Sequence, residues 1–161
     1  MKQEIIKLRA HHLENIIAYI NGDLRMRLLM LPMTKLSYGE KMAKNVSEIT
    51  NKLKASLNSG HPTEILVVKD LDSICEICPY KDPCLNGDNK EYNLLLEERI
   101  KNLKGFSGFL AKVIRKIDSY SSDDGRGECI DYQNLEEYGL KVGSRYQFKD
   151  IYGKLKDKIK L

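Results

Sequence analysis

Apolar residues recur every three or four positions along most of the chain, which is the spacing of one face of an α-helix. The clearest stripe runs from residue 40 to residue 57, where lysine, asparagine and glutamate fill the other positions. Its apolar members are Met42, Val46, Ile49, Leu53 and Leu57. Similar patterns predict helices over residues 13–20, 96–118, 134–138 and 148–159. Gly105 and Gly108 are expected to kink or split the helix over 96–118.

Two short stretches have the β-prone character of strands. One is residues 3–8, and the other is residues 64–69, which follow the turn-forming sequence Asn58 to Pro62. These two stretches can pair as a minimal ribbon. The pattern as a whole predicts a mostly α fold of the α+β type. We expect a single helical domain over residues 1–161, with one short two-stranded β element and a cysteine-rich loop.

Length and composition narrow the class of protein without naming a function. The chain has 161 residues, of which 42% are hydrophobic and 31% charged, as in one ordinary soluble domain. No run reaches the roughly 18 apolar residues of a membrane-crossing helix, and the first residues lack the apolar core of a secretion signal. We therefore expect a cytoplasmic protein with no membrane contact. The P-loop, nucleophile-elbow and zincin motifs are absent, so the sequence leaves open whether the protein is an enzyme.

The net charge of +4 is unevenly distributed. From Lys141 onward there are seven basic and two acidic residues, so the basic excess belongs to the C-terminal segment. A basic amphipathic helix of this kind usually presents a solvated face. The alternative function is a nucleic-acid or protein interaction module that uses this helix, with the cysteines incidental.

The cysteines are the most informative residues. Three of the four, Cys75, Cys78 and Cys84, lie within ten positions inside a loop that we place at residues 70–88. A chain of this size folds without disulfides, and in a reducing compartment such a cluster more often binds a metal. Two thiolates separated by two residues can turn toward one ion or cluster, and both iron–sulfur clusters and zinc accept thiolate ligands. Nearby acidic residues, at positions 70, 72 and 82, are of a kind common at turns, so hydrolytic metal chemistry has little support.

The segment from Cys75 to Cys84 reads C-x2-C-P-x4-C. It closely resembles the last three ligands of the cluster loop in endonuclease III-type DNA glycosylases, which holds a 4Fe-4S cluster. The first ligand of that loop would fall at Val68, which cannot coordinate a metal, and the chain has no hairpin glycine motif to grip DNA. The resemblance therefore implies the chemistry of the loop and not glycosylase activity.

A wider resemblance involves three separate motifs. Leu8 to Leu13 read LRAHHL, Asp72 to Cys75 read DSIC before the second and third cysteines, and Tyr138 to Gly143 read YGLKVG. Together they resemble an uncharacterised prokaryotic family whose members are suspected to bind an iron–sulfur cluster. Residues 86–128 look like a helical insertion relative to shorter members of that family.

The fourth ligand is left open. Where the family pattern has a cysteine, this chain has Asn15, whose carboxamide is a poor ligand for a thiolate-bound metal. Position 15 lies one helical turn after His11, which leaves His11 as a possible ligand from that helix face. Cys129, the remaining thiol, is the other candidate. His12 and Arg9 are expected beside the site, either behind the ligands or as a binding point for an anion.

The sequence thus favours a metal-binding protein of unknown biological role. An iron–sulfur cluster, with 4Fe-4S as the candidate type, is preferred over zinc as the cofactor. A cluster would serve electron transfer or sensing with a redox partner protein, whereas a zinc ion would be chiefly structural.

Overall fold

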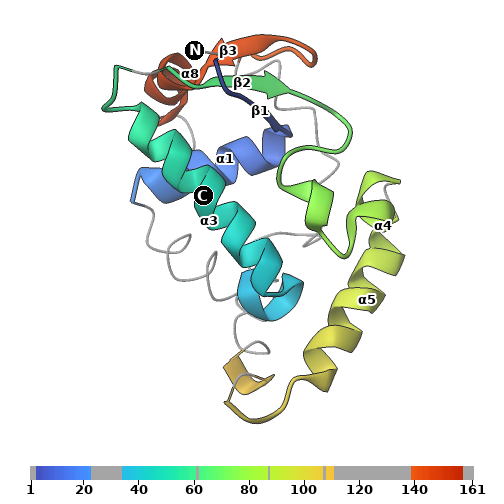
Figure 1. Ribbon diagram of the computed structural model, residues 1–161. Helices are drawn as coiled ribbons and strands as arrows, with labels where there is room; N and C mark the ends of the chain where they lie inside the picture. Colours follow the sequence, from blue (N-terminus) through green and yellow to red (C-terminus); the bar gives the residue numbers. More distant parts are fainter. Residues whose placement is uncertain are drawn as a thin grey trace.

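The computed structural model describes residues 3–22, 34–60, 62–86, 88–106, 108–110 and 139–157, with the backbone alone at residues 11 and 89 (Figure 1). In chain order its elements are β1 (Ile5–Leu8), α1 (Ala10–Ile20), α3 (Glu40–Ser56), β2 (Glu64–Val67), the 3₁₀ turn η1 (Cys75–Ile77), α4 (Lys81–Leu85), α5 (Asn89–Asn102), β3 (Arg145–Gln147) and α8 (Phe148–Leu155). Helices predominate and the sheet is small, which confirms the mostly α fold. None of the helices in these ranges is long and apolar enough to cross a membrane.

The sheet has three strands in the order β1-β2-β3. The predicted pairing of β1 with β2 is confirmed and is parallel, with Ile6 opposite Ile65. The two-stranded prediction was incomplete, because β3 adds to the other edge of β2 in antiparallel orientation. A strand of only three residues is too short for an alternating pattern to be recognised. The central strand β2 buries Ile65 completely, and burial alternates along the strand, as expected when one face of the sheet is covered.

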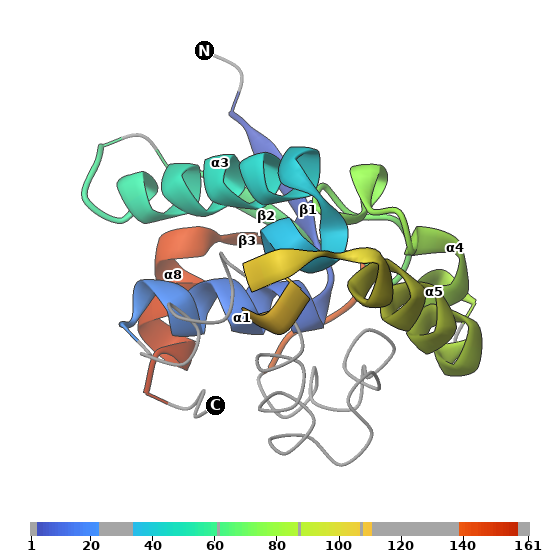
Figure 2. The ribbon, with the colours of Figure 1, turned by 90° about the horizontal axis from the view of Figure 1, so that it is seen from below.

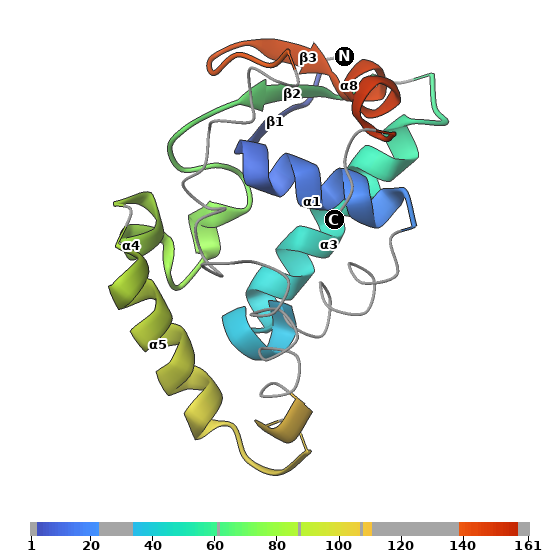
Figure 3. The ribbon, with the colours of Figure 1, turned by 180° about the vertical axis from the view of Figure 1, so that it is seen from behind.

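The main core lies where the helices cover this sheet. Figures 1 and 3 show α1 and α3 on the same side of the sheet, with α8 beside β3. The predicted stripe of α3 faces inward, because Met42, Val46, Ile49 and Leu53 are all buried. The closing helix α8 buries Phe148, Ile151 and Leu155 in the same way. Amphipathic faces read from the sequence therefore account for most of this core.

A second, smaller core joins α4 to α5. Figure 2 shows these two helices set to one side of α1, α3 and α8. Its buried members are Tyr80, Cys84, Tyr92, Leu96 and Ile100. Cys78 packs against both cores, so the cysteine loop lies at the junction between them. A cavity can persist at this junction, because the side chains of neither core fill the space between them.

Helix α5 both begins and ends earlier than the predicted helix over 96–118. It begins after Asp88, whose carboxylate accepts a hydrogen bond from the backbone N–H of Glu91 at 3.0 Å, and it ends at Asn102. Gly105 follows with a φ of 66°, in the left-handed region that glycine adopts without strain. Helical geometry resumes at residues 105–106 and 108–110, so the predicted split at the glycines is observed. The predicted helix over 134–138, and the helical insertion beyond residue 110, lie outside the described residues.

We expect Leu53→Ala to lower the free energy of unfolding by about 2–5 kcal/mol, because Leu53 is fully buried and its loss leaves a cavity. Leu94→Ala is the matched control, since Leu94 is a helical leucine that is 52% exposed. That variant should change the free energy by less than about 0.5 kcal/mol. Urea denaturation followed by circular dichroism measures both. Similar losses in the two variants would contradict this description of the core.

Candidate metal centre

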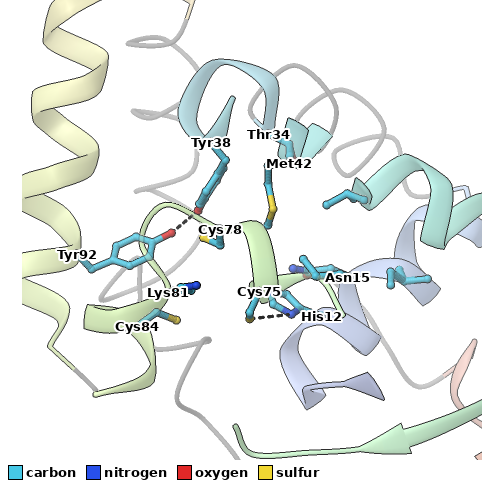
Figure 4. A pocket seen from close by; sticks show the side chains of 13 residues that line it. His12, Asn15, Thr34, Tyr38, Met42, Cys75, Cys78, Lys81, Cys84 and Tyr92 are labelled. Carbon is cyan, nitrogen blue, oxygen red and sulfur yellow. Dashed lines mark hydrogen bonds between the residues drawn. The ribbon is translucent and has the colours of Figure 1, made fainter. Parts of the chain in front are cut away.

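The three clustered cysteines lie around one cavity (Figure 4). Cys75, Cys78 and Cys84 line it together with His12 and Asn15. The cavity has a volume of about 130 Å³. Its walls come from α1, α3, η1, α4, α5 and residues 34–38, so segments distant in the sequence meet there. The structure therefore brings the cysteine loop and the histidine-bearing helix together, as the sequence predicted.

Local backbone geometry points two of the thiols the same way. Cys75 begins η1, and the backbone N–H of Cys78 donates a hydrogen bond to the Cys75 carbonyl at 2.9 Å. Side chains three residues apart eclipse in a 3₁₀ turn, so both thiols lie on one side of it. The chain then enters α4, where the backbone N–H of Cys84 donates to the Tyr80 carbonyl at 3.2 Å. This turn returns Cys84 to the same cavity.

Asp72 holds the loop to the start of α1. Its carboxylate is fully buried, and one oxygen, Oδ1, accepts hydrogen bonds from the backbone N–H groups of Ile74 at 2.9 Å and Cys75 at 2.7 Å. The other, Oδ2, accepts from the backbone N–H of Arg9 at 2.8 Å and lies 2.7 Å from His12 Nδ1. Both oxygens are therefore fully engaged. From the sequence, Asp72 belongs to the DSIC motif and to the acidic residues near the loop, but neither pattern predicted these contacts.

Asp72 and His12 form a charged pair beside Cys75. Burial alone lowers the pKa of His12, but the neighbouring carboxylate outweighs it and raises that pKa to about 10. Burial alone raises the pKa of Asp72, but the His12 charge and the backbone donors hold it well below its usual range. At neutral pH His12 is thus an imidazolium. It lies close to the first thiol, with Nδ1 3.9 Å from the Cys75 sulfur.

His12, Asp72 and Cys75 form a group that could hold a metal ion, because their ligand atoms all lie within 4.8 Å of one another. Among the described residues, Cys78 and Cys84 do not join such a group, so the three sulfurs do not all lie that close together. Burial raises the pKa of the Cys78 thiol to about 12, and the nearby Cys75, Cys84 and Asp72 add to this effect. A metal that bound Cys78 would therefore have to displace its proton.

Two further cations lie near the thiols. Arg9, the residue before α1, is only 2% exposed, and its Nη1 donates to the Cys84 sulfur at 3.5 Å. Lys81 lines the cavity, and Figure 4 shows its side chain between those of Cys78 and Cys84. The sequence placed Arg9 beside a thiolate-rich site. Lys81 was missed, because one lysine in a lysine-rich chain carries no signal of its own.

Of the other residues considered for the fourth ligand, only Asn15 has a described side chain. The side chain of His11 and all of Cys129 lie outside the described residues, so both stay predictions as fourth ligands. Asn15 faces the cavity. Tyr38 and Tyr92 also line it, and their hydroxyl groups are hydrogen-bonded to each other. Sequence reasoning had no means of finding this tyrosine pair, since the two residues are brought together only by the packing of α5.

Comparison with protein families, curated proteins and solved structures finds no match to this chain.

We expect Asp72→Asn to lower the free energy of unfolding by about 3–5 kcal/mol, because it leaves the His12 charge without its buried partner. Asp70→Asn is the control, since Asp70 is an exposed aspartate two residues away. That variant should be nearly neutral. The measurement is the urea midpoint at pH 7, and comparable losses in both variants would show that Asp72 does not anchor the loop.

The His12–Asp72 pair also predicts a pH dependence. The His12 pKa is raised from 6.5 to about 10, so its contribution is complete below pH 6.5 and is lost as the pH rises through 10. The Asp72 contribution is present above about pH 4 and is lost on acidification. In the presence of a chelator, we expect the free energy of unfolding to fall by about 1–3 kcal/mol between pH 7 and pH 10.5. His12→Gln should remove that slope, and parallel curves for the two proteins would refute the assignment.

Proposed function

We propose that this is a metal-binding protein whose Cys75, Cys78 and Cys84 thiolates hold an iron–sulfur cluster in the cavity. The observation that carries the proposal is that all three thiols line one cavity, with His12 among them. Such a cavity is an uncommon setting for cysteines that serve only as core residues, because the core otherwise packs without voids. Zinc remains the alternative occupant.

The spacing of the sulfurs favours a cluster over zinc. A tetrahedral zinc ion bonds each thiolate at about 2.3 Å, which brings the sulfurs to about 4 Å from one another. Within the described part of the chain, the three sulfurs do not all come within 4.8 Å. A cluster distributes its thiolates over several iron atoms and so accepts a wider arrangement. The cavity volume of about 130 Å³ also exceeds what a single ion requires.

The charges around the cavity support a thiolate-rich occupant. Arg9, Lys81 and His12 supply three cations, and the buried Asp72 supplies one anion. Three neutral thiols give this positive excess nothing to balance, whereas three thiolates do. Burial raises the pKa of the Cys78 thiol to about 12, so a bound metal would have to remove its proton, and the cations would then face the thiolates so formed. The walls of the cavity are therefore suited to thiolates that a metal has deprotonated.

The proposed role is electron transfer or sensing with a redox partner protein. A bound cluster supplies one-electron chemistry, and burial, charge and hydrogen bonds to the sulfurs tune its potential. The chain provides these through the buried Arg9, which donates to the Cys84 sulfur. Ile77, between two of the cysteines, is 46% exposed, so the loop lies close beneath the surface. That closeness would allow an electron to pass to a docked partner.

We expect Cys78→Ser to abolish iron and sulfide binding and to lower the stability of protein prepared without oxygen. The reason is that Cys78 packs against both cores and is the central thiol of the three. Ile77→Ser is the matched control, because it places the same side chain at a 46% exposed position of the same loop, and it should keep the metal content. The measurements are elemental analysis for iron, zinc and sulfide and a visible absorption spectrum. Unchanged metal content in Cys78→Ser would contradict the proposal. One zinc ion per chain, in a colourless protein, would show that the site holds zinc and not a cluster.

A further inference from the structure

Cys75 and Cys78 are held at the separation that a disulfide requires. The backbone N–H of Cys78 donates to the Cys75 carbonyl at 2.9 Å, which closes a turn of four residues. A 3₁₀ turn rises about 2 Å per residue, so its first and fourth Cα atoms lie about 6 Å apart. Disulfides join residues whose Cα atoms are about 4.4–6.8 Å apart. Because the two side chains also eclipse in such a turn, their sulfurs can bond without rearrangement of the backbone.

Hydrogen bonds fix the turn on both sides. The Asp72 carboxylate accepts from the Cys75 backbone N–H at 2.7 Å, and the Asp72 carbonyl accepts from the Glu76 backbone N–H at 3.2 Å. After the turn, the Cys78 carbonyl accepts from the Lys81 backbone N–H at 3.3 Å. Two thiols fixed in this way meet at a high effective concentration, because little chain entropy is lost when they bond.

The third thiol is held apart from this pair. Cys84 lies on α4, and Nη1 of the buried Arg9 donates to its sulfur at 3.5 Å. Figure 4 shows the Lys81 side chain between those of Cys78 and Cys84. The geometry therefore favours Cys75 over Cys84 as the disulfide partner of Cys78.

A small oxidant can reach the two sulfurs in the metal-free chain. Both thiols line the cavity, whose volume is about 130 Å³, and a water molecule occupies about 30 Å³. Hydrogen peroxide has two oxygen atoms and therefore fits beside them. Cys78 is half-buried and its neighbour Ile77 is exposed, so the turn lies close to the surface. Cysteines that sense oxidants commonly lie beside a second thiol that completes a disulfide.

We propose that Cys75 and Cys78 form a reversible disulfide that closes the metal site when a hydroperoxide oxidises the metal-free chain. In the first step one thiol sulfur bonds to a peroxide oxygen, the O–O bond breaks, and the other oxygen leaves with the thiol proton as water. In the second step the other sulfur forms the S–S bond, the S–O bond breaks, and a second water leaves with the second thiol proton. Two electrons pass from the cysteines to the peroxide. The control of metal binding rests on the proposed function, because the disulfide takes two of its three thiolates.

The disulfide is suited to a reversible switch. It closes a loop of only four residues, whereas a disulfide restricts the unfolded chain most when the loop is long. It therefore adds little to the stability of the fold. A dithiol reductant reverses it by becoming a disulfide itself, and its two protons return to the cysteines. Until then the chain has lost two of the three thiolates that would hold the metal.

Peptide mapping tests the disulfide on the full metal-free chain. One equivalent of hydrogen peroxide is added without air, the remaining thiols are alkylated in denaturant, and the chain is cut with trypsin. Trypsin cuts on both sides of residues 70–81, which places Cys75 and Cys78 in one peptide and Cys84 in the next. We expect the 70–81 peptide to carry no alkyl group and to be lighter by two hydrogen atoms. A fully alkylated peptide, or a link from it to any other peptide, would overturn the assignment.

Two serine variants identify the pair. Cys84→Ser is the matched control and should yield the linked 70–81 peptide to the same extent as the parent chain. Cys75→Ser should yield none of it. Loss of the linked peptide in Cys84→Ser would contradict the pairing. Circular dichroism checks that each variant is folded, and the map of the parent chain needs no variant.

Iron loading tests the switch. The oxidised chain should take up at least about tenfold less iron and sulfide than the reduced chain, because two thiolate ligands are missing. Treatment with dithiothreitol, removed before loading, should restore the uptake. Equal uptake by the oxidised and reduced chains would overturn the switch alone. A reduced chain that binds neither iron nor zinc would overturn the proposed function and the switch with it, whereas the peptide map decides the disulfide separately.

Discussion

The buried carboxylate of Asp72 is the interaction on which the site depends. It joins the short segment between β1 and α1 to the turn that begins the cysteine loop. A buried carboxylate is tolerated only when its charge and lone pairs are satisfied. Here the backbone donors and the His12 imidazolium satisfy them completely. The loop therefore has one stable position relative to α1, and that position determines where the three thiols lie.

The sheet provides the frame for that carboxylate. Parallel pairing of β1 with β2 brings the ends of both strands to one edge, where β1 leads into α1 and β2 leads into the loop. Residues that follow parallel strands at the same edge become neighbours. Histidine, arginine and the cysteines thus converge because of strand direction, without any sequence motif that contains them all. The small second core then supplies the far wall through α4 and α5.

The sequence predicts the periodic parts of this structure and the chemical residues with local spacing. The stripe of α3, the strand before the loop and the C-x2-C-x5-C segment can all be read directly, because each is encoded within a few turns of chain. The contacts of the buried Asp72 and the position of Lys81 beside the thiols could not be predicted from the sequence. Each depends on a partner brought near by the fold, and Asp72 and Arg9 are 63 positions apart. The third strand was missed for a different reason, since three residues are too few to show alternation.

The difference between local and distant contacts has a consequence for how the protein assembles. The three thiols fall within a single short segment, so a newly made chain can offer them to a metal before the sheet exists. The Asp72–His12 contact spans 60 positions and the Arg9–Cys84 contact spans 75. The positive side chains therefore reach the thiols only when the whole fold has formed. Contacts of such separation form late in folding. A metal held by the bare segment would meet a different electrostatic environment from one held by the native protein. The difference between its binding free energies in these two states is what the metal adds to the stability of the fold.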